Sequence, residues 1–327
     1  MKKVLMAAVF GILIVIMLNL NNYNSMKEKT IYCMDTVVTV KIKGSNDDLK
    51  AIENIIIKYD EMFNAYDENS QLSQVNNGKK EISDEMEEIL TDCLSLAKET
   101  DGAFDPTLKP ISDLWGISEG KTEIPDKTDI EKALSNTGYE EVRLSDGKIN
   151  LSGRKLDLGG AVKGFVTEKI RTEIKKRGIK KAIIDLGGNI YVFNTKGDVK
   201  VGVQEPFSQR GNALFTIPVN DTAVVTSGPY ERYFEKNGKI YHHIFDRKTG
   251  YPAESEISSV TVFGNGTKTD ILSTAILVMG KEKAIDLYKK RGGFEYAVVE
   301  NKNIYATEGI YGKITVLNDE YRLFPIK

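Results

Sequence analysis

The chain has 327 residues, of which 41% are hydrophobic and 28% charged, a composition typical of one large globular domain or two lobes. With 45 lysines and arginines against 47 aspartates and glutamates, its net charge of -2 gives no electrostatic footprint for nucleic acid. Two histidines leave little room for a histidine-rich metal site, so any metal is expected to be a hard cation with oxygen ligands.

The first 24 residues have the pattern of an export signal. Lys2 and Lys3 precede an unbroken apolar run from Val4 to Leu18, and an asparagine-rich stretch follows. The run is slightly shorter than the roughly 20 residues of a membrane span, and no clear A-x-A cleavage site follows it. A cleaved signal peptide and an N-terminal membrane anchor both stay open. Both predict that residues 30–327 form an exported domain.

The segment after this leader predicts a strand and three helices. Residues 30–44 alternate and are rich in β-branched side chains, which predicts a strand. Apolar residues recur at helical spacing over residues 46–66. Ser83 is expected to cap a second amphipathic helix, and Thr128 with Glu131 to form the capping box of a short third one. Cys33 and Cys93 are interpreted as two buried apolar side chains rather than a disulfide.

From residue 141 the pattern changes to short strands and glycine-rich turns, with one helix after Lys163 and another after Asp270. No internal repeat or low-complexity linker is found. Strands outnumber strand–helix–strand units, so the sequence predicts an α+β fold with mixed or antiparallel sheets and flanking helices.

The stretch DLGGAVKGFVTEKI (157–170) has features of a phosphate site. Gly159 and Gly160 precede Lys163 and a predicted helix, and glycines ahead of a helix N-terminus let the backbone approach a pyrophosphate. The spacing matches neither G-x-G-x-x-G nor G-x-x-x-x-G-K-[ST], so a tight turn explains it equally well. A second pair of glycines interrupts the strand-like residues 183–194 and indicates a bulge or a close approach to a ligand.

Three further features are ambiguous from the residues alone. Asp270 and Thr274 share a face at the start of a predicted helix, which suits Mg²⁺, although acids are common in a first helical turn without any ligand. His243, near Asp246, could be a general base or a structural residue. Residues 101–116, which contain the only tryptophan, form either a packed loop or a lid over an aromatic ligand.

Eight motifs follow one another in an order that points to one family. They are MDTVVTV, AYDENSQLSQVN, GAFDPTLKPISDLWG, DLGGAVKG, DLGGNIYV, TSGPYERYF, HIFDRKTGYP and TDILSTAILVMG. Together they resemble the ApbE family, the FAD:protein FMN transferases, from about Tyr32 to past Gly280. The resemblance implies an ApbE-like, T-fold-like core that binds FAD and Mg²⁺ in a cleft between two lobes. It also implies a bacterial protein exported to the outer face of the cell membrane.

The activity implied by this family is transfer of FMN from FAD to a Thr or Ser hydroxyl of an acceptor protein, with release of AMP. The acceptors belong to membrane-linked electron-transfer systems and carry an S/T-G-A-S/T-like motif. This chain has no such motif, since Pro229 stands at the small-residue position of TSGPY. Two alternatives remain: hydrolysis of FAD to FMN and AMP, and an exported FAD-binding protein without turnover.

The family motifs assign roles to individual residues of this chain. His243 is expected to deprotonate the acceptor hydroxyl. The side chains of Asp270 and Thr274, with main-chain carbonyls near Gly160 and Ser273, are expected to hold Mg²⁺. The expected FAD-binding residues are Met34, Tyr66, Ser70, Asp105, Thr107, Lys163, Thr226, Ser227 and Gly228. The chain departs from the usual family residues at Asp35 (often Gly), Gln71 (often Glu) and Val162 (often Ala).

Overall fold

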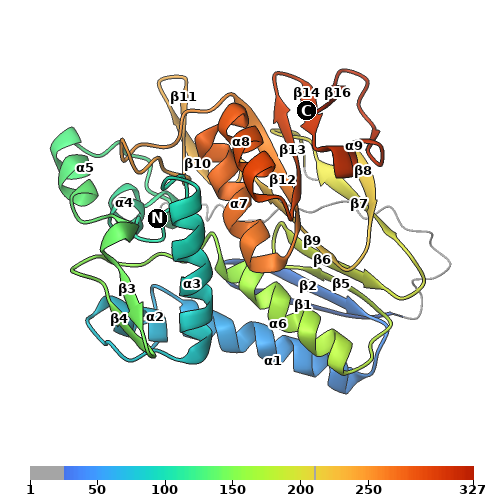
Figure 1. Cartoon of the computed structure of the whole chain (residues 1–327), viewed down its shortest axis with the longest axis horizontal. Coiled ribbons are helices and arrows are strands. Elements are labelled where there is room, and N and C mark those ends of the chain that lie inside the picture. Colours follow the sequence, from blue (N-terminus) through green and yellow to red (C-terminus); the bar gives the residue numbers. More distant parts are fainter. Residues whose placement is uncertain (1–25, 210) are drawn as a thin grey trace, which may run out of the picture.

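A nine-stranded sheet forms the centre of the fold in this computed structural model, which describes residues 26–209 and 211–327 (Figure 1). Neighbouring strands of the sheet are antiparallel except β14 and β16, which are parallel. In sheet order the strands are β1 (Lys27–Cys33), β2 (Thr36–Ile42), β5 (Lys181–Asp185), β6 (Asn189–Asn194), β9 (Thr222–Ser227), β12 (Ile257–Gly264), β13 (Glu295–Glu300), β14 (Asn303–Ala306) and β16 (Arg322–Pro325).

Three smaller sheets accompany the large one. The first is three-stranded, in the order β15 (Thr315–Val316), β8 (Ala213–Val219) and β7 (Val199–Gln204). The other two are hairpins, β3 (Arg143–Ser145) with β4 (Lys148–Asn150), and β10 (Tyr233–Lys236) with β11 (Lys239–His242).

In the part of the chain that the structure describes, five α-helices follow one another between β2 and β3, and the other four lie between later strands. The helices are α1 (Asn46–Phe63), α2 (Gln71–Asn76), α3 (Asp84–Glu99), α4 (Lys109–Trp115), α5 (Lys127–Leu134), α6 (Val162–Lys176), α7 (Gly266–Met279), α8 (Lys281–Arg291) and α9 (Glu308–Tyr311), with short 3₁₀ turns η2 (Ile117–Glu119) and η3 (Tyr139–Glu141). The predicted α+β fold with mixed sheets and flanking helices is therefore confirmed. The division into two lobes stays a prediction.

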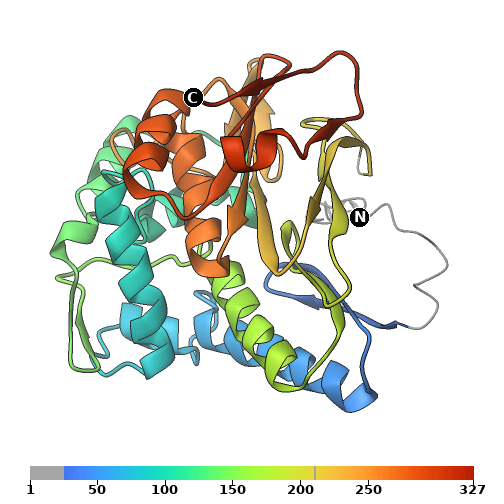
Figure 2. The ribbon, with the colours of Figure 1, turned by 45° about the vertical axis from the view of Figure 1, so that its right-hand side comes forward.

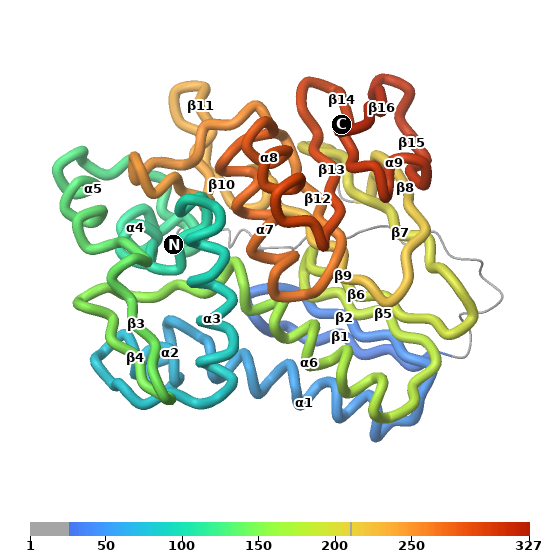
Figure 3. The backbone as a smooth tube through the Cα atoms, viewed as in Figure 1, coloured from blue at the N-terminus to red at the C-terminus, as the bar shows by residue number. Residues whose placement is uncertain are grey.

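Two hydrophobic cores lie on opposite faces of the large sheet. On one face α1, α6 and α7 pack side by side, with Ile56, Phe165 and Ile276 among the buried residues of this core (Figures 2 and 3). On the other face the sheet packs against β7 and β8, where Val201 and Phe215 are buried. Because apolar side chains on both faces of its central strands are buried, this sheet forms a fixed support for the loops at its edges.

A third, smaller core surrounds Trp115, at the end of α4. The indole is buried, and its Nε1–H donates to the Gly250 carbonyl at 2.8 Å. The rings of Phe234, Tyr241 and Phe245 pack around it. The tryptophan of residues 101–116 is therefore part of a packed core, while Phe104, Leu108 and Ser112 of the same segment line the cavity described below.

The predicted strand over residues 30–44 is a hairpin. Met34 and Asp35 both have φ of 55°, as in the two-residue type I′ turns that join antiparallel strands. Aspartate adopts this left-handed conformation more readily than most residues, because its short polar side chain hydrogen-bonds locally. Asp35 can therefore replace glycine in this turn.

The structure confirms the predicted cap of α3 and contradicts the predicted starts of α5 and α7. The hydroxyl of Ser83 caps α3 by accepting from the Met86 amide at 3.3 Å, as expected. The capping box at Thr128 is wrong, since α5 begins at Lys127 after Asp126. The helix that carries Asp270 begins at Gly266, so Asp270 lies beyond the first turn and the macrodipole does not explain it.

The structure also adds elements that the sequence pattern did not reveal. The polar loop after α1 contains the short helix α2, and α8 follows α7 directly after Gly280. Cys33 and Cys93 are both free and buried, so the interpretation without a disulfide is confirmed. Within residues 26–209 and 211–327, no helix is long and apolar enough to cross a membrane. The predicted signal or anchor, residues 1–24, lies outside the described residues.

Candidate active site

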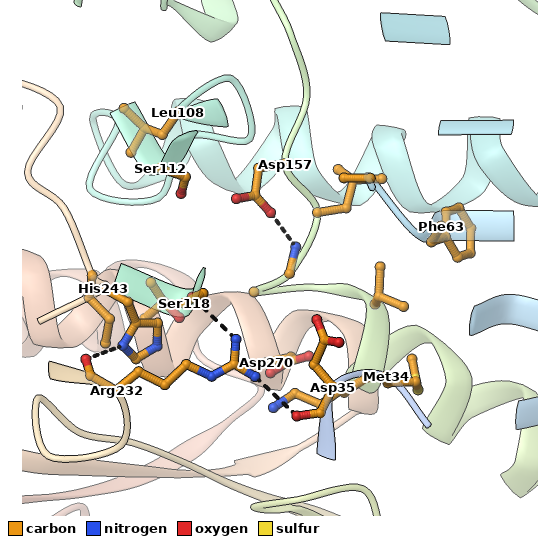
Figure 4. Close-up of a pocket in the computed structure, with 18 of the residues that line it drawn as sticks. Met34, Asp35, Phe63, Leu108, Ser112, Ser118, Asp157, Arg232, His243 and Asp270 are labelled. Atoms are coloured by element: carbon orange, nitrogen blue, oxygen red, sulfur yellow. Dashed lines mark hydrogen bonds between the residues drawn. The ribbon is translucent and has the colours of Figure 1, made fainter. Parts of the chain in front are cut away.

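A cavity of about 300 Å³ brings together segments that lie far apart in the sequence (Figure 4). Its wall includes the β1–β2 turn, the end of α1, the glycine-rich loop before α6, and one face of α7. Ten of the residues predicted from the sequence line it: Met34, Tyr66, Asp105, Gly160, Lys163, Thr226, Ser227, His243, Asp270 and Thr274. Four others, Ser70, Thr107, Gly228 and Ser273, do not line it.

The predicted residues outside the cavity wall support residues within it. The Ser70 hydroxyl caps α2 and donates to the Asn64 carbonyl at 2.6 Å, which fixes the loop that presents Tyr66. Ser273, which is buried, lies 2.8 Å from the hydroxyl of Ser227. These side chains therefore position the wall, and their predicted contacts with FAD or a metal stay predictions.

Asp105 and Thr107 are also occupied by internal hydrogen bonds. The Asp105 carboxylate accepts from the amide and hydroxyl of Thr107, at 2.8 and 2.6 Å, and Arg247 lies 3.5 Å from its other oxygen. The Thr107 hydroxyl in turn accepts from the Gly138 amide at 2.7 Å. Because both side chains are satisfied within the protein, their main effect is to hold the loop before α4.

Asp270 lies where α6 and α7 touch. Its Oδ2 accepts from the Gly164 amide, near the start of α6, at 2.8 Å. Burial raises the pKa of this carboxyl, while the Lys163 charge and the Gly164 amide oppose the increase. Thr274, one turn further along α7, lines the same cavity. A Cβ placed on Gly160 would stand 3.4 Å from the Thr274 hydroxyl oxygen, so the glycine loop and this face of α7 are close neighbours.

The main-chain amides of the glycine loop are largely used inside the protein. The Gly159 amide donates to Asp157 at 2.9 Å, and those of Ala161 and Val162 donate to the Leu158 carbonyl. With the Gly164 amide bound to Asp270, little of this helix N-terminus is left to bind an anion. The expected phosphate loop therefore has to rely on cations and carbonyl oxygens.

The two adjacent histidines differ in the use of their ring nitrogens. His242 is buried: its Nε2 lies 3.0 Å from the Ala253 carbonyl and its Nδ1 accepts from the Ile244 amide. His243 lines the cavity and uses Nδ1 alone, 3.2 Å from the Arg232 carbonyl (Figure 4). A proton on Nδ1 for this bond leaves the lone pair of Nε2 available, as a general base requires.

The charge state of His243 follows from its surroundings. Burial, together with the positive charge of Arg232, lowers the pKa of the imidazole to about 3. The ring is therefore neutral at physiological pH, with no proton on Nε2. The nearby Lys163 acts in the same direction.

Sequence reasoning missed Glu231 and Arg232, both of which line the cavity. Glu231 has a buried Oε1 without a hydrogen-bond partner, and burial raises the pKa of its carboxyl to about 7. The Arg232 guanidinium donates to the Asp35 carbonyl and the Ser118 hydroxyl, both at 3.3 Å (Figure 4). Both residues lie in the motif TSGPYERYF, but no periodicity or spacing distinguishes them within it, and their place in the cavity follows only from the fold.

The cavity is acidic, although a pyrophosphate is an anion. Among the described lining residues the basic side chains are Lys163 and Arg232. The acidic ones are Asp35, Asp60, Asp105, Glu119, Asp157, Glu231 and Asp270. A buried carboxylate and a hydroxyl four residues apart, beside a carbonyl-bearing glycine loop, are oxygen donors of the kind that Mg²⁺ uses with phosphates. The donor set therefore fits a hard divalent cation, which would also offset the negative charge.

The fold and this cavity define an α+β protein whose cavity lies beside the close contact between α6 and α7. A family model described as the ApbE family matches residues 34–298. Because that match covers most of the sequence, the chain belongs to the ApbE family.

Individual relatives agree with this assignment. A Treponema pallidum protein named FAD:protein FMN transferase is 33% identical over 257 residues, 72% of this chain and 71% of its own length. A Klebsiella pneumoniae protein of the same name is 28% identical over 301 residues, 89% of this chain and 94% of its own. The crystal structure of the Thermotoga maritima ApbE protein is similar with a TM-score of 0.77 and 29% identity, covering 89% of this chain and 96% of its own.

Proposed function

We propose that this protein is an FAD:protein FMN transferase that uses Mg²⁺ to move FMN from FAD onto a Ser or Thr hydroxyl of an acceptor protein. The observation that carries the proposal is the single cavity that His243, with a free Nε2, lines together with Asp270 and Thr274. The names of the curated relatives support the same activity.

The reaction is a phosphoryl transfer in which one P–O bond forms and one breaks. The acceptor oxygen attacks the phosphorus of the FMN half of FAD, and the bridging oxygen leaves with AMP. His243 takes the hydroxyl proton at Nε2, while its Nδ1–H stays on the Arg232 carbonyl. General-base assistance of this kind contributes roughly 10²–10⁴-fold to a rate.

Asp270, Thr274 and the main-chain carbonyls of Gly160 and Ser273 are the groups proposed to hold Mg²⁺. When bound, the cation supplies positive charge to the pyrophosphate and to the leaving AMP. Lys163 adds a second positive charge from the start of α6, and its charge reaches Asp270, Glu231 and His243. Together with the cation, Asp270, Thr274 and Lys163 would hold the pyrophosphate in one position. The acceptor hydroxyl would then attack the phosphorus from a single direction.

The cellular setting is proposed from the N-terminal pattern. Residues 1–24 would act as a signal peptide or membrane anchor, which would place residues 30–327 on the outer face of the cell membrane. The acceptor would then be a subunit of a membrane-linked electron-transfer system with an S/T-G-A-S/T-like motif.

One experiment tests the proposed activity. The protein is mixed with FAD, Mg²⁺ and an acceptor domain that carries the motif, and the products are measured by mass spectrometry and chromatography. A mass increase of one FMN on the acceptor, with AMP released, is the expected result. Free FMN and AMP without any modified acceptor would instead assign FAD hydrolysis, and FAD left intact would refute an enzymatic role.

A further inference from the structure

Glu231 combines two properties that no other residue in the described part of the chain combines. Within residues 26–209 and 211–327, seven buried side-chain nitrogen or oxygen atoms have no hydrogen-bond partner. Of these seven, only Oε1 of Glu231 belongs to a residue that lines the cavity with His243 and Asp270. Burying a polar atom without a partner is costly, and native proteins rarely do so away from functional sites. Glu231 therefore presents an unused acceptor to whatever the cavity binds.

The two basic side chains of the cavity wall are directed away from this oxygen. The Lys163 ammonium donates to the Gly187 carbonyl at 3.5 Å, and the Arg232 guanidinium donates to the β1–β2 turn and to η2 (Figure 4). Neither donates to Oε1 of Glu231. Burial raises the pKa of the Glu231 carboxyl, and the charges of Lys163 and Arg232 oppose this increase only in part. The protein itself therefore leaves the acceptor unsatisfied.

The residues on either side hold Glu231 against the cavity. The Tyr230 ring packs on the core beneath β7 and β8, and its centre lies 5.3 Å from that of Phe207. A Cβ on Gly228 would stand 2.4 Å from the Tyr230 ring, so the chain turns tightly at this point. The Arg232 side chain on the other side is fixed by its two hydrogen bonds. Glu231 lies between two anchored side chains, which limits its freedom to turn toward solvent.

The charges around Glu231 indicate which part of FAD can supply a donor. Its carboxyl is within electrostatic reach of Lys163 and Asp270, the groups assigned above to the pyrophosphate and its cation. The pyrophosphate is ionised at neutral pH and has only acceptor oxygens. The ring N–H groups of flavin and adenine lie at the two far ends of the molecule. The sugar hydroxyls on either side of the pyrophosphate are the nearest donors to it.

We propose that Oε1 of Glu231 accepts a hydrogen bond from a sugar hydroxyl next to the pyrophosphate of FAD, on either the ribityl chain or the adenosine ribose. This inference rests on the proposed transferase activity, because FAD is the substrate of that activity. The bond makes Glu231 a positioning residue that fixes the dinucleotide along the cavity. It also discriminates against ligands without that hydroxyl, since they leave the buried oxygen unpaired.

The test compares Glu231→Gln with Glu231→Met. The two variants have the same charge and similar length, but only glutamine keeps an acceptor oxygen. Their comparison therefore separates the hydrogen bond from the loss of negative charge, which affects both alike. Glu282→Gln and Glu282→Met, at an exposed position on α8 outside the cavity wall, are the matched controls. Thermal unfolding checks that all four variants are folded.

FAD binding to the full chain is measured in Mg²⁺ by stopped-flow flavin fluorescence, before any turnover. Glu231→Met should bind FAD roughly 5–50-fold more weakly than Glu231→Gln, because a donor of the ligand is left unpaired. The two Glu282 variants should bind FAD equally. FMN and ADP, titrated as competitors of FAD, identify the source of the hydroxyl. A loss for FMN alone assigns the ribityl chain, and a loss for ADP alone assigns the adenosine ribose.

Equal FAD affinities of Glu231→Gln and Glu231→Met would overturn the inference. Equal losses for FMN and ADP would also overturn it, because they would indicate a general disturbance of the cavity. Unchanged FAD affinity with a higher KM for the acceptor protein would assign the donor to the acceptor instead. FMN transfer by the unaltered protein is measured separately. Intact transfer with equal FAD affinities refutes only the role of Glu231, whereas an unaltered protein that transfers no FMN refutes the proposed activity.

Discussion

Gly164 and Gly266 are in direct contact where α6 meets α7. A Cβ on Gly164 would overlap the Gly266 carbonyl and would stand 2.7 Å from the Asp270 Cβ. Because neither glycine has a side chain, the start of α6 reaches the Asp270 carboxylate, which accepts the Gly164 amide at 2.8 Å. The contact therefore fixes both the helix crossing and the position of the candidate metal ligand.

Gly164→Ala should destabilise the protein by about 1–3 kcal/mol or more, because main-chain atoms on α7 cannot move aside cheaply. Urea unfolding gives the free energy of unfolding. Gly312→Ala is the control, since no atom lies within 4 Å of a Cβ at that position and its φ is -72°. Similar free energies of unfolding for the two variants would show that α6 and α7 can move apart without loss of stability.

Asp270→Asn should remove Mg²⁺ binding and at least about 100-fold of FAD cleavage, because the amide keeps the hydrogen bond from Gly164 but loses the charge. Calorimetric titration with Mg²⁺ and FAD measures binding directly, and thermal unfolding checks that the variant is folded. Retained Mg²⁺ affinity in a folded variant would place the cation elsewhere.

His243→Ala should lose roughly 10²–10⁴-fold of FMN transfer while FAD still binds. His242→Ala removes two internal hydrogen bonds instead, so it should lower stability and affect the transfer rate much less. Transfer kinetics and thermal unfolding of the two variants separate these effects. Equal losses of transfer in both, at equal stability, would argue against a proton-accepting role for His243.

His243 should also make stability depend on pH in the ligand-free protein. Its folded-state pKa, about 3, lies below the ordinary value of 6.5, so the unfolded chain binds the proton first as pH falls. Stability should drop by up to about 1.4 kcal/mol per pH unit below pH 6.5. Between pH 7 and 5, the free energy of unfolding of His243→Gln should fall by about 1–2 kcal/mol less than that of the unaltered protein, as measured by urea unfolding.

Glu231 should act in the opposite direction. Its folded-state pKa, about 7, lies above the ordinary value of 4.5, so the free energy of unfolding falls as pH rises from about 4.5 to 7. Above pH 7, Glu231→Gln should be about 1–3 kcal/mol more stable than the unaltered protein. Glu282→Gln, on the surface of α8, is the control. Equal free energies of unfolding for the two variants at pH 8 would show that burial does not destabilise the ionised carboxyl at position 231.

Local patterns in the sequence predicted much of the fold. The amphipathic spacing of α1 and α3 and the cap at Ser83 depend on neighbouring residues, and these elements are present where expected. The β1–β2 hairpin was missed because its turn residues, Met34 and Asp35, continue the alternation of a strand and show their positive φ only in the structure. Tertiary contacts determine that turn.

The candidate site was predictable to the extent that its residues fall in recognisable motifs. His243, Asp270 and Thr274 were predicted in this way, and the structure places them around one cavity. Glu231 and Arg232 were not predicted, because their importance depends on which distant segments meet them. Thr107 and Ser70 were predicted as FAD-binding residues, but their hydrogen bonds to neighbouring main chain could not be read from the sequence.

Arg232 connects two parts of the cavity through different atoms. Its main-chain carbonyl fixes the His243 ring, while its guanidinium ties the β1–β2 turn to η2. Replacing this side chain would therefore loosen the entrance, and loss of its positive charge would also let the pKa of the His243 imidazole rise. In evolutionary terms, access to the cavity and the basicity of its imidazole are coupled at a single codon, so one substitution there changes both.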